Sequence, residues 1–223
     1  MGKQIFIGLA TEGTTDVRFL ESIVKRTFED IALKECQQDI DIYIFVSETA
    51  KQGLSFPEYV LQASTDGLKT WGIMTLAIHT DADRDTLHER MENKIRPAQE
   101  LLGKQGEEYC KLLTPIIPVR MIEAWMLADK ELFKEEIGTS KPDAELGINR
   151  DPESMADPKQ AIENAIRIAT EHLPKRRQRL SISELYEIIG DTISLEALST
   201  LDSYKHFKEA VRTTYKALNY LQE

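Results

Sequence analysis

The stretch KQIFIGLATEGTTD, residues 3–16, decides the fold class of this chain. Residues 3–10 form a continuous apolar run, which is typical of a strand buried on both faces of a sheet. Gly13 then allows a sharp turn, and Thr14 and Thr15 can cap a helix whose apolar residues recur at helical spacing. A buried strand that leads directly into a helix is typical of a βαβ unit, so a parallel sheet is expected.

The same alternation continues through the first half of the chain. Further strands are predicted at 40–46, 72–78 and 112–119, with helices at 54–64, 86–102 and 120–129. The last strand contains prolines, which places it at a sheet edge. Beyond residue 132 the strand signals stop, and a loop over 135–157 is followed by four predicted helices. We therefore expect an α/β core over residues 1–131, with about four parallel strands and helices on both faces. A C-terminal helical subdomain over 132–223 is expected to pack on it.

Composition restricts the classes of function. With 223 residues, 41% of them hydrophobic, the chain can bury a core without disulfide or metal staples. Its two cysteines, Cys36 and Cys110, lie in no ligand-like spacing. No apolar run is long enough to cross a membrane, and the N-terminus lacks the layout of a signal peptide, so a cytoplasmic protein is expected. A net charge of -10 argues against passive coating of nucleic acid, although an enzyme that meets phosphates through divalent cations remains compatible with it.

Acidic residues follow three of the predicted strands. Glu12 and Asp16 follow the first strand, Asp81 and Asp83 follow the third, and Glu123 lies in an apolar stretch after the fourth. Ligands of open parallel sheets gather outside the carboxyl ends of the strands, so these acids are expected to meet there. In extended backbone, Asp81 and Asp83 would point the same way. Because clustered carboxylates need a cation, the pattern predicts a Mg²⁺ site and metal-assisted attack on a phosphodiester.

Each motif also has a plainer structural explanation. An acidic residue in a first helical turn stabilises the helix dipole, and Arg120 with Glu123 is equally an i,i+3 pair. His79, just before the acidic motif, is either a metal or proton-transfer residue or a structural histidine. Trp71 and Trp125 are expected in the core or in an interface. The conjunction of acids on one predicted sheet edge is what favours a site.

Two short motifs resemble a known fold. Glu12-Gly13 after the first strand and Asp81-x-Asp83 after a later one resemble the signature motifs of the Toprim fold, a Rossmann-like fold shared by topoisomerases, bacterial primases and nucleases of the overcoming-lysogenization-defect (OLD) type. Glu12-x-x-x-Asp16 is similar to the variant in OLD nucleases. Residues 118–129, with 157–159 downstream, more closely resemble a small Toprim-like family known only as a domain of unknown function. That similarity spans most of the chain.

The resemblance implies a Mg²⁺- or Mn²⁺-dependent endonuclease that cuts DNA or RNA, tRNA included. It also implies an ABC- or AAA-type ATPase partner in an anti-phage defence complex, with this chain as the toxic effector. A homodimer is a separate hypothesis about partners. No separate tyrosine-bearing or zinc-binding domain is present in the pattern, which favours hydrolysis over topoisomerase or primase activity. By this resemblance the metal-binding acids are Glu12, Asp16, Asp81 and Asp83, with Asp85 and Glu123 as secondary candidates, and the catalytic residues are Glu12, Asp81, Asp83 and Lys159.

Basic residues are candidates for contact with the nucleic-acid backbone. One is Arg120, and the others form a cluster after Pro174 that consists of Lys175, Arg176, Arg177 and Arg179. The cluster is equally explained as a solvated turn with cations after a helix C-terminus.

Two other functions fit the same residues. A strand that ends in Asp81-x-Asp83 also resembles haloacid-dehalogenase-type phosphatases, in which one Asp is the nucleophile and the other the acid/base. Asp85 stands where that pattern has Thr or Val, and Glu12 is left without a task. The second alternative is a non-catalytic docking module of an ATPase complex. An EF-hand reading of the segment is discounted because Thr86 stands where the calcium loop needs Gly.

Overall fold

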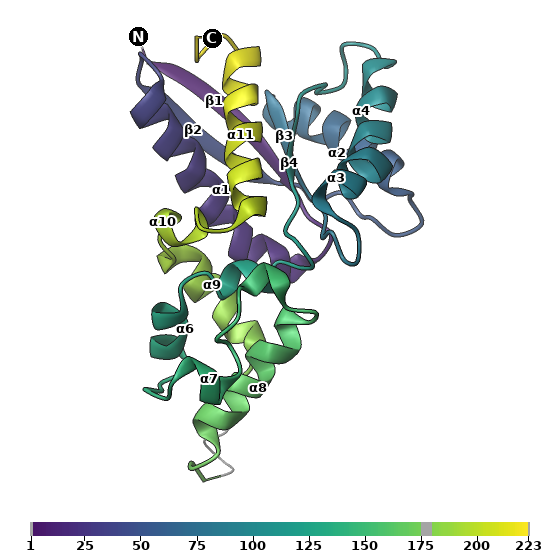
Figure 1. Cartoon of the computed structure of the whole chain (residues 1–223). Coiled ribbons are helices and arrows are strands. Elements are labelled where there is room, and N and C mark those ends of the chain that lie inside the picture. Colours follow the sequence, from purple (N-terminus) through teal and green to yellow (C-terminus); the bar gives the residue numbers. More distant parts are fainter. Residues whose placement is uncertain (1, 175–179, 223) are drawn as a thin grey trace.

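The central sheet has four parallel strands in residues 2–174 and 180–222, which are the residues that the computed structural model describes. The strands lie in the order β2-β1-β3-β4, with β2 and β4 at the edges (Figure 1). The pairs β1–β2, β1–β3 and β3–β4 are all parallel. Their bounds are Lys3–Ala10 for β1, Ile40–Val46 for β2, Thr75–His79 for β3 and Leu113–Ile116 for β4. The predicted α/β class, with a parallel sheet and helices on both faces, is confirmed.

Helices cover both faces of the sheet because each parallel connection must cross over it. Helix α1 (Thr14–Glu35) covers one face, and α2 (Phe56–Trp71) and α4 (Arg96–Gly103) cover the other. The chain leaves β1 first towards β2 and later returns to β3 on the opposite side of β1. The topological switch point therefore lies between the carboxyl ends of β1 and β3, where ligands of such sheets bind.

The last long helix, α11 (Asp202–Ala217), returns to the sheet and lies on the same face as α1 (Figure 1, yellow). The Tyr215 hydroxyl donates to the carbonyl of Phe28 in α1 at 2.9 Å. Thr214 and Thr114 of β4 share a buried hydrogen bond of 2.7 Å. Helix α11 therefore packs as part of the α/β core.

The helices between β4 and α11 form a lobe beyond the carboxyl ends of the strands (Figure 1). The fully buried Trp125 donates its indole N–H to Ser203 at 2.7 Å and packs edge-on against Tyr204. One hydrophobic core runs continuously from β1 into this lobe. The bounds of its elements are Glu123–Met126 for α5, Lys130–Glu136 for α6, Asp143–Leu146 for α7, Pro152–Ser154 for η2, Pro158–Thr170 for α8, Ile182–Thr192 for α9 and Leu195–Leu198 for α10.

Several element boundaries differ from those predicted. Helix α2 starts at Phe56 because Pro57 stands in its first turn, where proline is tolerated. It ends at Trp71, and Gly72 caps it with a left-handed φ of 65°. The predicted helix over 120–129 is reduced to α5, and the predicted loop over 135–157 contains α7 and η2. The helix predicted over 86–102 is a run of α3 (Leu87–Arg90), the π-helical turn η1 (Met91–Ile95) and α4. Within the described segments, no helix has the length and apolar character of a membrane span.

Candidate functional site

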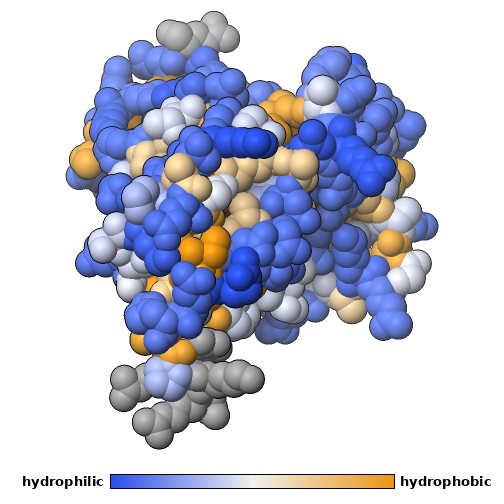
Figure 2. All heavy atoms as spheres, turned by 60° about the horizontal axis from the view of Figure 1, so that its bottom comes forward, coloured by the Kyte–Doolittle hydropathy of each residue, from blue (hydrophilic) through white to orange (hydrophobic). Residues whose placement is uncertain are grey.

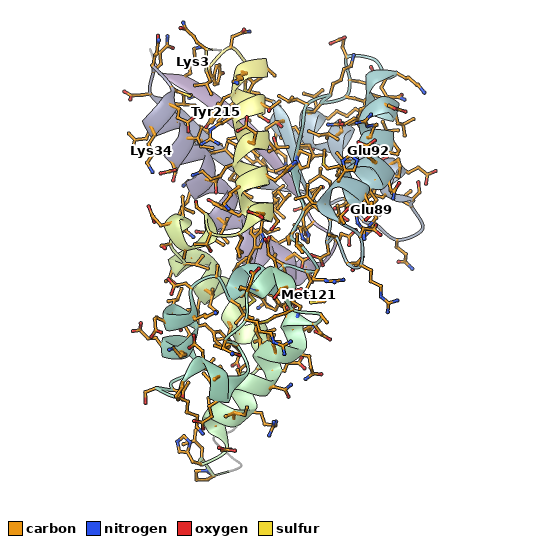
Figure 3. The ribbon with its side chains drawn as sticks, viewed as in Figure 1. Lys3, Lys34, Glu89, Glu92, Met121 and Tyr215 are labelled. Atoms are coloured by element: carbon orange, nitrogen blue, oxygen red, sulfur yellow. The ribbon has the colours of Figure 1, made fainter. Side chains whose placement is uncertain are left out.

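Side chains that follow β1 and β3 meet at the switch point of the sheet. Thr80, directly after β3, donates its hydroxyl to Oε1 of Glu12, two residues beyond β1, at 2.9 Å. Figure 3 labels Met121, which lies where the strands end and the helical lobe begins. Figure 2 brings this end of the molecule forward and shows a mainly hydrophilic surface with small hydrophobic spots.

Two lysines neutralise Glu12. Lys94 Nζ lies 2.8 Å from Glu12 Oε1 and 3.0 Å from the Thr80 hydroxyl, and Lys51 Nζ lies 3.5 Å from the same carboxylate oxygen. Burial alone would raise the pKa of Glu12, but the hydrogen bond and charge of Lys94, with Lys51 and Thr80, lower it overall. Lys94 projects from η1, and π-helical turns are frequent at functional sites. Glu12 is therefore held ionised by cations that the sequence reasoning did not name.

His79 lies between the other two acids. Its ring is fully buried, with Nδ1 3.4 Å from Asp16 and Nε2 3.2 Å from Asp81. Burial would lower the pKa of His79, but the two carboxylates outweigh it and raise the pKa to about 9. Among the described residues Nδ1 has no hydrogen-bond partner, and its contact with Asp16 is an ion pair to Oδ2, the oxygen that also accepts from the Gly13 N–H at 2.8 Å. His79 thus joins the acids after β1 and β3 as an imidazolium.

The C-terminal lobe supplies groups to the same end of the sheet. Tyr186 of α9 donates its hydroxyl to the buried carboxylate of Glu123 at 2.5 Å. Burial raises the pKa of Glu123, and of its charged neighbours Asp81 raises that pKa while Lys159 lowers it. Burial, Glu123 and the charges of Asp16 and Asp81 all raise the pKa of Tyr186. Glu123 therefore lies near both Asp81 and Lys159, with Tyr186 as a polar group that the sequence did not indicate.

Asp83 does not share the surroundings of Asp81. Its φ of 55° is left-handed, so the expectation that both side chains point the same way along extended backbone is wrong. Arg120, at φ 64°, is also left-handed. Two hydrogen bonds connect these residues. The Asp83 N–H donates to the Arg120 carbonyl at 2.8 Å, and Arg120 Nη1 donates to the Asp83 carbonyl at 3.2 Å. Non-glycine residues in this region cost about 1–3 kcal/mol each, which is typical of functional loops.

Arg90 stabilises the loop 81–85 through contacts with three of its residues. Its buried guanidinium donates to the carbonyl of Ala82 at 2.7 Å and to the carboxylate of Asp83 at 2.9 Å, and it forms an ion pair of 3.4 Å with Asp85. Asp83 and Asp85 are thus ion-pair partners of one arginine. The predicted nucleic-acid contacts at Lys175, Arg176, Arg177 and Arg179 lie outside the described residues.

The donors suit a hard divalent ion in chemical type, because Mg²⁺ prefers carboxylate oxygens. As the side chains stand, however, no three His, Cys, Asp or Glu side chains of residues 2–174 and 180–222 are gathered to hold a metal. Glu12 is turned to Lys94, and Asp16 and Asp81 are turned to His79. The site is therefore a cluster of acids whose carboxylates form ion pairs with lysine and histidine side chains of the same chain.

One sequence signal could have indicated the missed cations. Arg90 and Lys94 are four residues apart in the segment that follows the acidic motif, so they share a helix face. That segment must return over the sheet to reach β4. Lys51 and Tyr186 carry no such signal, because both reach the site through tertiary packing.

Comparison with known proteins identifies a family. A search of curated proteins and a search of solved structures give no match. A family model described as "Domain of unknown function (DUF4276)" matches residues 11–200. The match includes the acids after β1 and β3 as well as Lys159 and Tyr186 of the lobe. The chain therefore belongs to the DUF4276 family.

Proposed function

We propose that the protein is a divalent-metal-dependent nuclease that hydrolyses phosphodiester bonds of DNA or RNA. The observation that carries this proposal is the convergence of Glu12, Asp16 and Asp81 on the switch point between β1 and β3. Ligands of open parallel sheets bind at this point. The resemblance of these acids to Toprim motifs points the same way.

The mixture of charges suits a substrate that brings phosphate and a metal together. Carboxylates bind a hard cation, whereas lysines bind phosphate oxygens as point charges. Lys94 lies against Glu12, and Lys159 is near enough to Glu123 to lower its pKa. Acids alone would repel a phosphate backbone, whereas lysines alone would bind phosphate but could not hold a metal ion.

We assign roles to residues on this basis. Glu12, Asp16 and Asp81 would hold Mg²⁺ or Mn²⁺, which supplies Lewis-acid activation of water and neutralises charge on the phosphate. His79 orients Asp16 and Asp81 from its buried position, as outer partners of ligating carboxylates do. Lys94 is placed to exchange its contact with Glu12 for one with a phosphate oxygen. Arg90 and Arg120 keep the loop 81–85 in its left-handed turn.

The biological setting is also a proposal. The resemblance to OLD-type nucleases supports a cytoplasmic toxic effector of an anti-phage defence complex with an ABC- or AAA-type ATPase. With a net charge of -10, the chain repels nucleic acid at long range, and a basic partner would supply the missing attraction.

The test is cleavage of plasmid DNA, total RNA and tRNA with Mg²⁺ or Mn²⁺, and with EDTA as the blank. We expect metal-dependent cleavage that is abolished in the double variant Asp81→Ala/Asp83→Ala with an unchanged circular dichroism spectrum. Glu107→Ala/Glu108→Ala is the matched control, because it removes two acids from an exposed loop. Activity retained in the first double variant would end the proposal.

The two alternatives make different predictions in the same assays. The phosphatase hypothesis predicts turnover of phosphomonoesters, although Asp81 and Asp83 do not form the side-by-side pair that it needs. The docking-module hypothesis predicts no tight Mn²⁺ binding in calorimetry. Saturable Mn²⁺ binding that Asp81→Ala removes favours the nuclease.

A further inference from the structure

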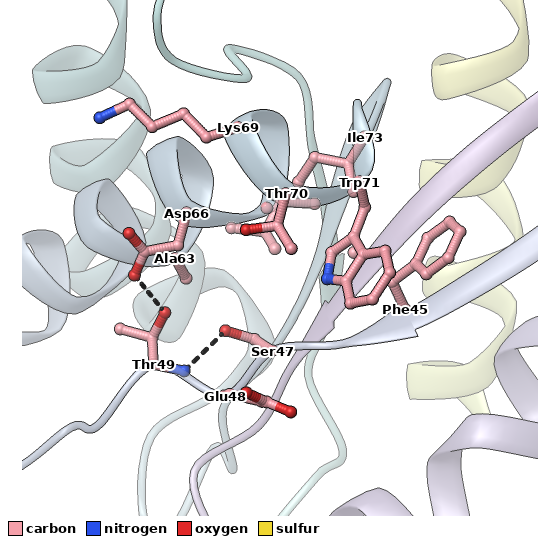
Figure 4. Close-up of a pocket in the computed structure, with 13 residues that line it drawn as sticks. Phe45, Ser47, Glu48, Thr49, Ala63, Asp66, Lys69, Thr70, Trp71 and Ile73 are labelled. Atoms are coloured by element: carbon pink, nitrogen blue, oxygen red, sulfur yellow. Dashed lines mark hydrogen bonds between the residues drawn. The ribbon is translucent and has the colours of Figure 1, made fainter.

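A cavity of ≈ 310 Å³ lies between α2 and the edge strand β2 (Figure 4). Its walls include Phe45 and Ser47 from the end of β2, Asp66 and Thr70 from α2, and Trp71 at the end of that helix. Nothing in the proposed catalytic machinery uses these residues. The volume is at the lower end of the range of small-ligand pockets, about 300–1,000 Å³.

The cavity exists because α2 packs on β1 and β3 and leaves this face of β2 open. On the other face of β2, Ile42 is buried in the core beside α1. Tyr43 alternates with Ile42 along the strand and is 42% exposed. Trp71 is 48% exposed, so it is not a core residue. It is the last residue of α2.

Aromatic rings form a continuous row along this open face. Tyr43 and Phe6 have ring centroids 5.3 Å apart, and Phe6 and Phe45 are 6.0 Å apart. Phe45 and Trp71 stack at 4.9 Å with an interplanar angle of 10°, as Figure 4 shows. Rows of accessible aromatic rings are the means by which proteins hold unpaired bases, since every base has a π-face.

The polar groups of the cavity favour an uncharged ligand with polar edges. The carboxylate of Asp66 is already engaged by Thr49 at 2.9 Å and by Gln62 at 2.7 Å. Glu48 lies at the edge of the cavity, and Lys69 extends away from the aromatic pair (Figure 4). Two acids beside the cavity disfavour phosphate. Both oxygens of Asp66 already accept hydrogen bonds from neutral donors, and a cationic ligand is the alternative that a titration with argininamide tests. Hydroxyls and the indole N–H pair well with the edge of a nucleobase.

The cavity is connected to the candidate site through the loop 47–51. The Ser47 N–H donates to the carbonyl of Leu9 in β1 at 2.7 Å, and Thr49 lines the cavity. At the other end of the loop, Lys51 pairs with Glu12. The same short loop therefore contacts both the cavity and the acid after β1.

We propose that this cavity binds an unpaired nucleobase of the nucleic-acid substrate. This inference rests on the proposed nuclease function and adds a site for the base to the acids that face the phosphate. It predicts that unpaired or flipped nucleotides are preferred over continuous duplex, because a paired base cannot enter.

The test uses the full chain in EDTA and follows tryptophan emission during titration with free nucleosides. Trp71 reports on the cavity, while Trp125 is fully buried and bonded to Ser203, so its emission stays constant. We expect saturable quenching by at least one nucleoside at millimolar concentration and none by ribose 5-phosphate.

Two variants that add the same charge make the test specific. Thr70→Arg fills the cavity from an exposed helix position and should weaken nucleoside binding at least tenfold. Thr213→Arg adds an arginine on the exposed face of α11 and should leave binding unchanged. Because nucleosides are neutral, the added charge cannot change their affinity through long-range attraction.

Three results would overturn the inference: no quenching by any nucleoside, equal binding by Thr70→Arg and the unmodified protein, or quenching by argininamide in place of nucleosides. The last result would assign the cavity to a basic segment of a protein partner. Nucleosides contain no phosphodiester and the buffer no metal, so these outcomes do not depend on cleavage. A protein that binds nucleosides but cuts no nucleic acid would instead contradict the proposed nuclease function.

Discussion

Two ion-pair networks begin at one short motif and lie in different surroundings. The inner network consists of Asp16, His79 and Asp81, and its histidine is fully buried. The outer network consists of Asp83, Asp85 and Arg90, and the two aspartate side chains are 62% and 41% exposed. The left-handed φ of Asp83 separates two aspartates that are only two residues apart. Close spacing in a sequence motif therefore does not by itself mean a shared role.

The two networks also differ in the chemistry of their cations. A guanidinium stays charged at every physiological pH, so Arg90 is a permanent brace for the loop. An imidazolium can lose its proton, and the charge of the inner network therefore depends on pH. Under the proposed function the inner network would respond to a bound metal and substrate, whereas the outer one maintains the shape of the loop.

The largest expected effect separates the two aspartates in cleavage. If the proposed nuclease function holds, Asp81→Asn should lower kcat/KM at least about a hundredfold, because a proposed metal ligand is lost. Asp83→Asn should lower it roughly tenfold or less, because its carboxylate acts through the loop. Both variants are measured on the substrate that the unmodified protein cuts best. Equal losses would show that the two aspartates share one role and would remove the distinction between the networks.

The next effect is a dependence of stability on pH that comes from the inner network. The pKa of His79 is raised from 6.5 to about 9 in the folded state, so its contribution is fully present below pH 6.5 and is lost as the pH rises through 9. The free energy of unfolding should fall by about 3 kcal/mol across this range, measured by urea denaturation in EDTA.

Histidine variants provide the controls for this pH effect. His79→Leu should abolish the fall in stability between pH 6.5 and 9. His206→Gln should retain it, because burial lowers the pKa of His206 and moves its titration out of this range. If the fall persisted in His79→Leu, another group would be its cause.

Breaking the outer network should have a smaller effect that does not change with pH. Arg90→Leu should lower the free energy of unfolding by about 1–2 kcal/mol, since the carbonyl of Ala82 loses one of its two donors and keeps only the Asp85 N–H, while the exposed carboxylates regain water. Arg96→Leu, which breaks an exposed pair with Glu92, should change it by less than about 0.5 kcal/mol. If Arg90→Leu lowered the free energy of unfolding as little as Arg96→Leu does, Arg90 would not stabilise the loop.

The smallest effect tests the strain in the loop. Arg120→Gly should be more stable than Arg120→Ala by about 1 kcal/mol in thermal unfolding, because only glycine accepts φ 64° without cost. Lys104, at φ -87°, is the control, and there the glycine variant should be the less stable one. The same order of stabilities at both positions would mean that the left-handed turn is unstrained.

Much of the fold could be predicted from local patterns. The apolar run before Glu12 and the later apolar runs indicate four buried strands, and the prolines correctly place β4 at an edge. Boundaries were less accurate where short helices depend on packing, as at α5, where Trp125 is buried against Tyr204. The burial of such a residue depends on α11, more than seventy positions away, and no local window contains it.

The candidate site, like the fold, could be predicted from the sequence only in part. That Glu12, Asp16 and Asp81 follow strands at one end of the sheet could be predicted from the sequence, because parallel strands end on the same edge. That β1 and β3 are neighbours was decided only by the structure. The partners of these acids do not follow from it. Lys94 reaches Glu12 across 82 positions, and Tyr186 reaches Glu123 across 63. The open aromatic face of β2 was equally hidden, since it arises from where α2 lies.

By itself the sequence determined that strands and helices alternate, that the strands are buried, and that acids stand at their carboxyl ends. The physical reason is local, because the period of apolar residues dictates which faces can be removed from water. Only the tertiary structure decided that Asp81 forms an ion pair with His79 while Asp83 forms one with Arg90, and that two lysines form ion pairs with Glu12. Those pairings depend on one left-handed backbone angle and on the docking of distant helices, which no periodicity records.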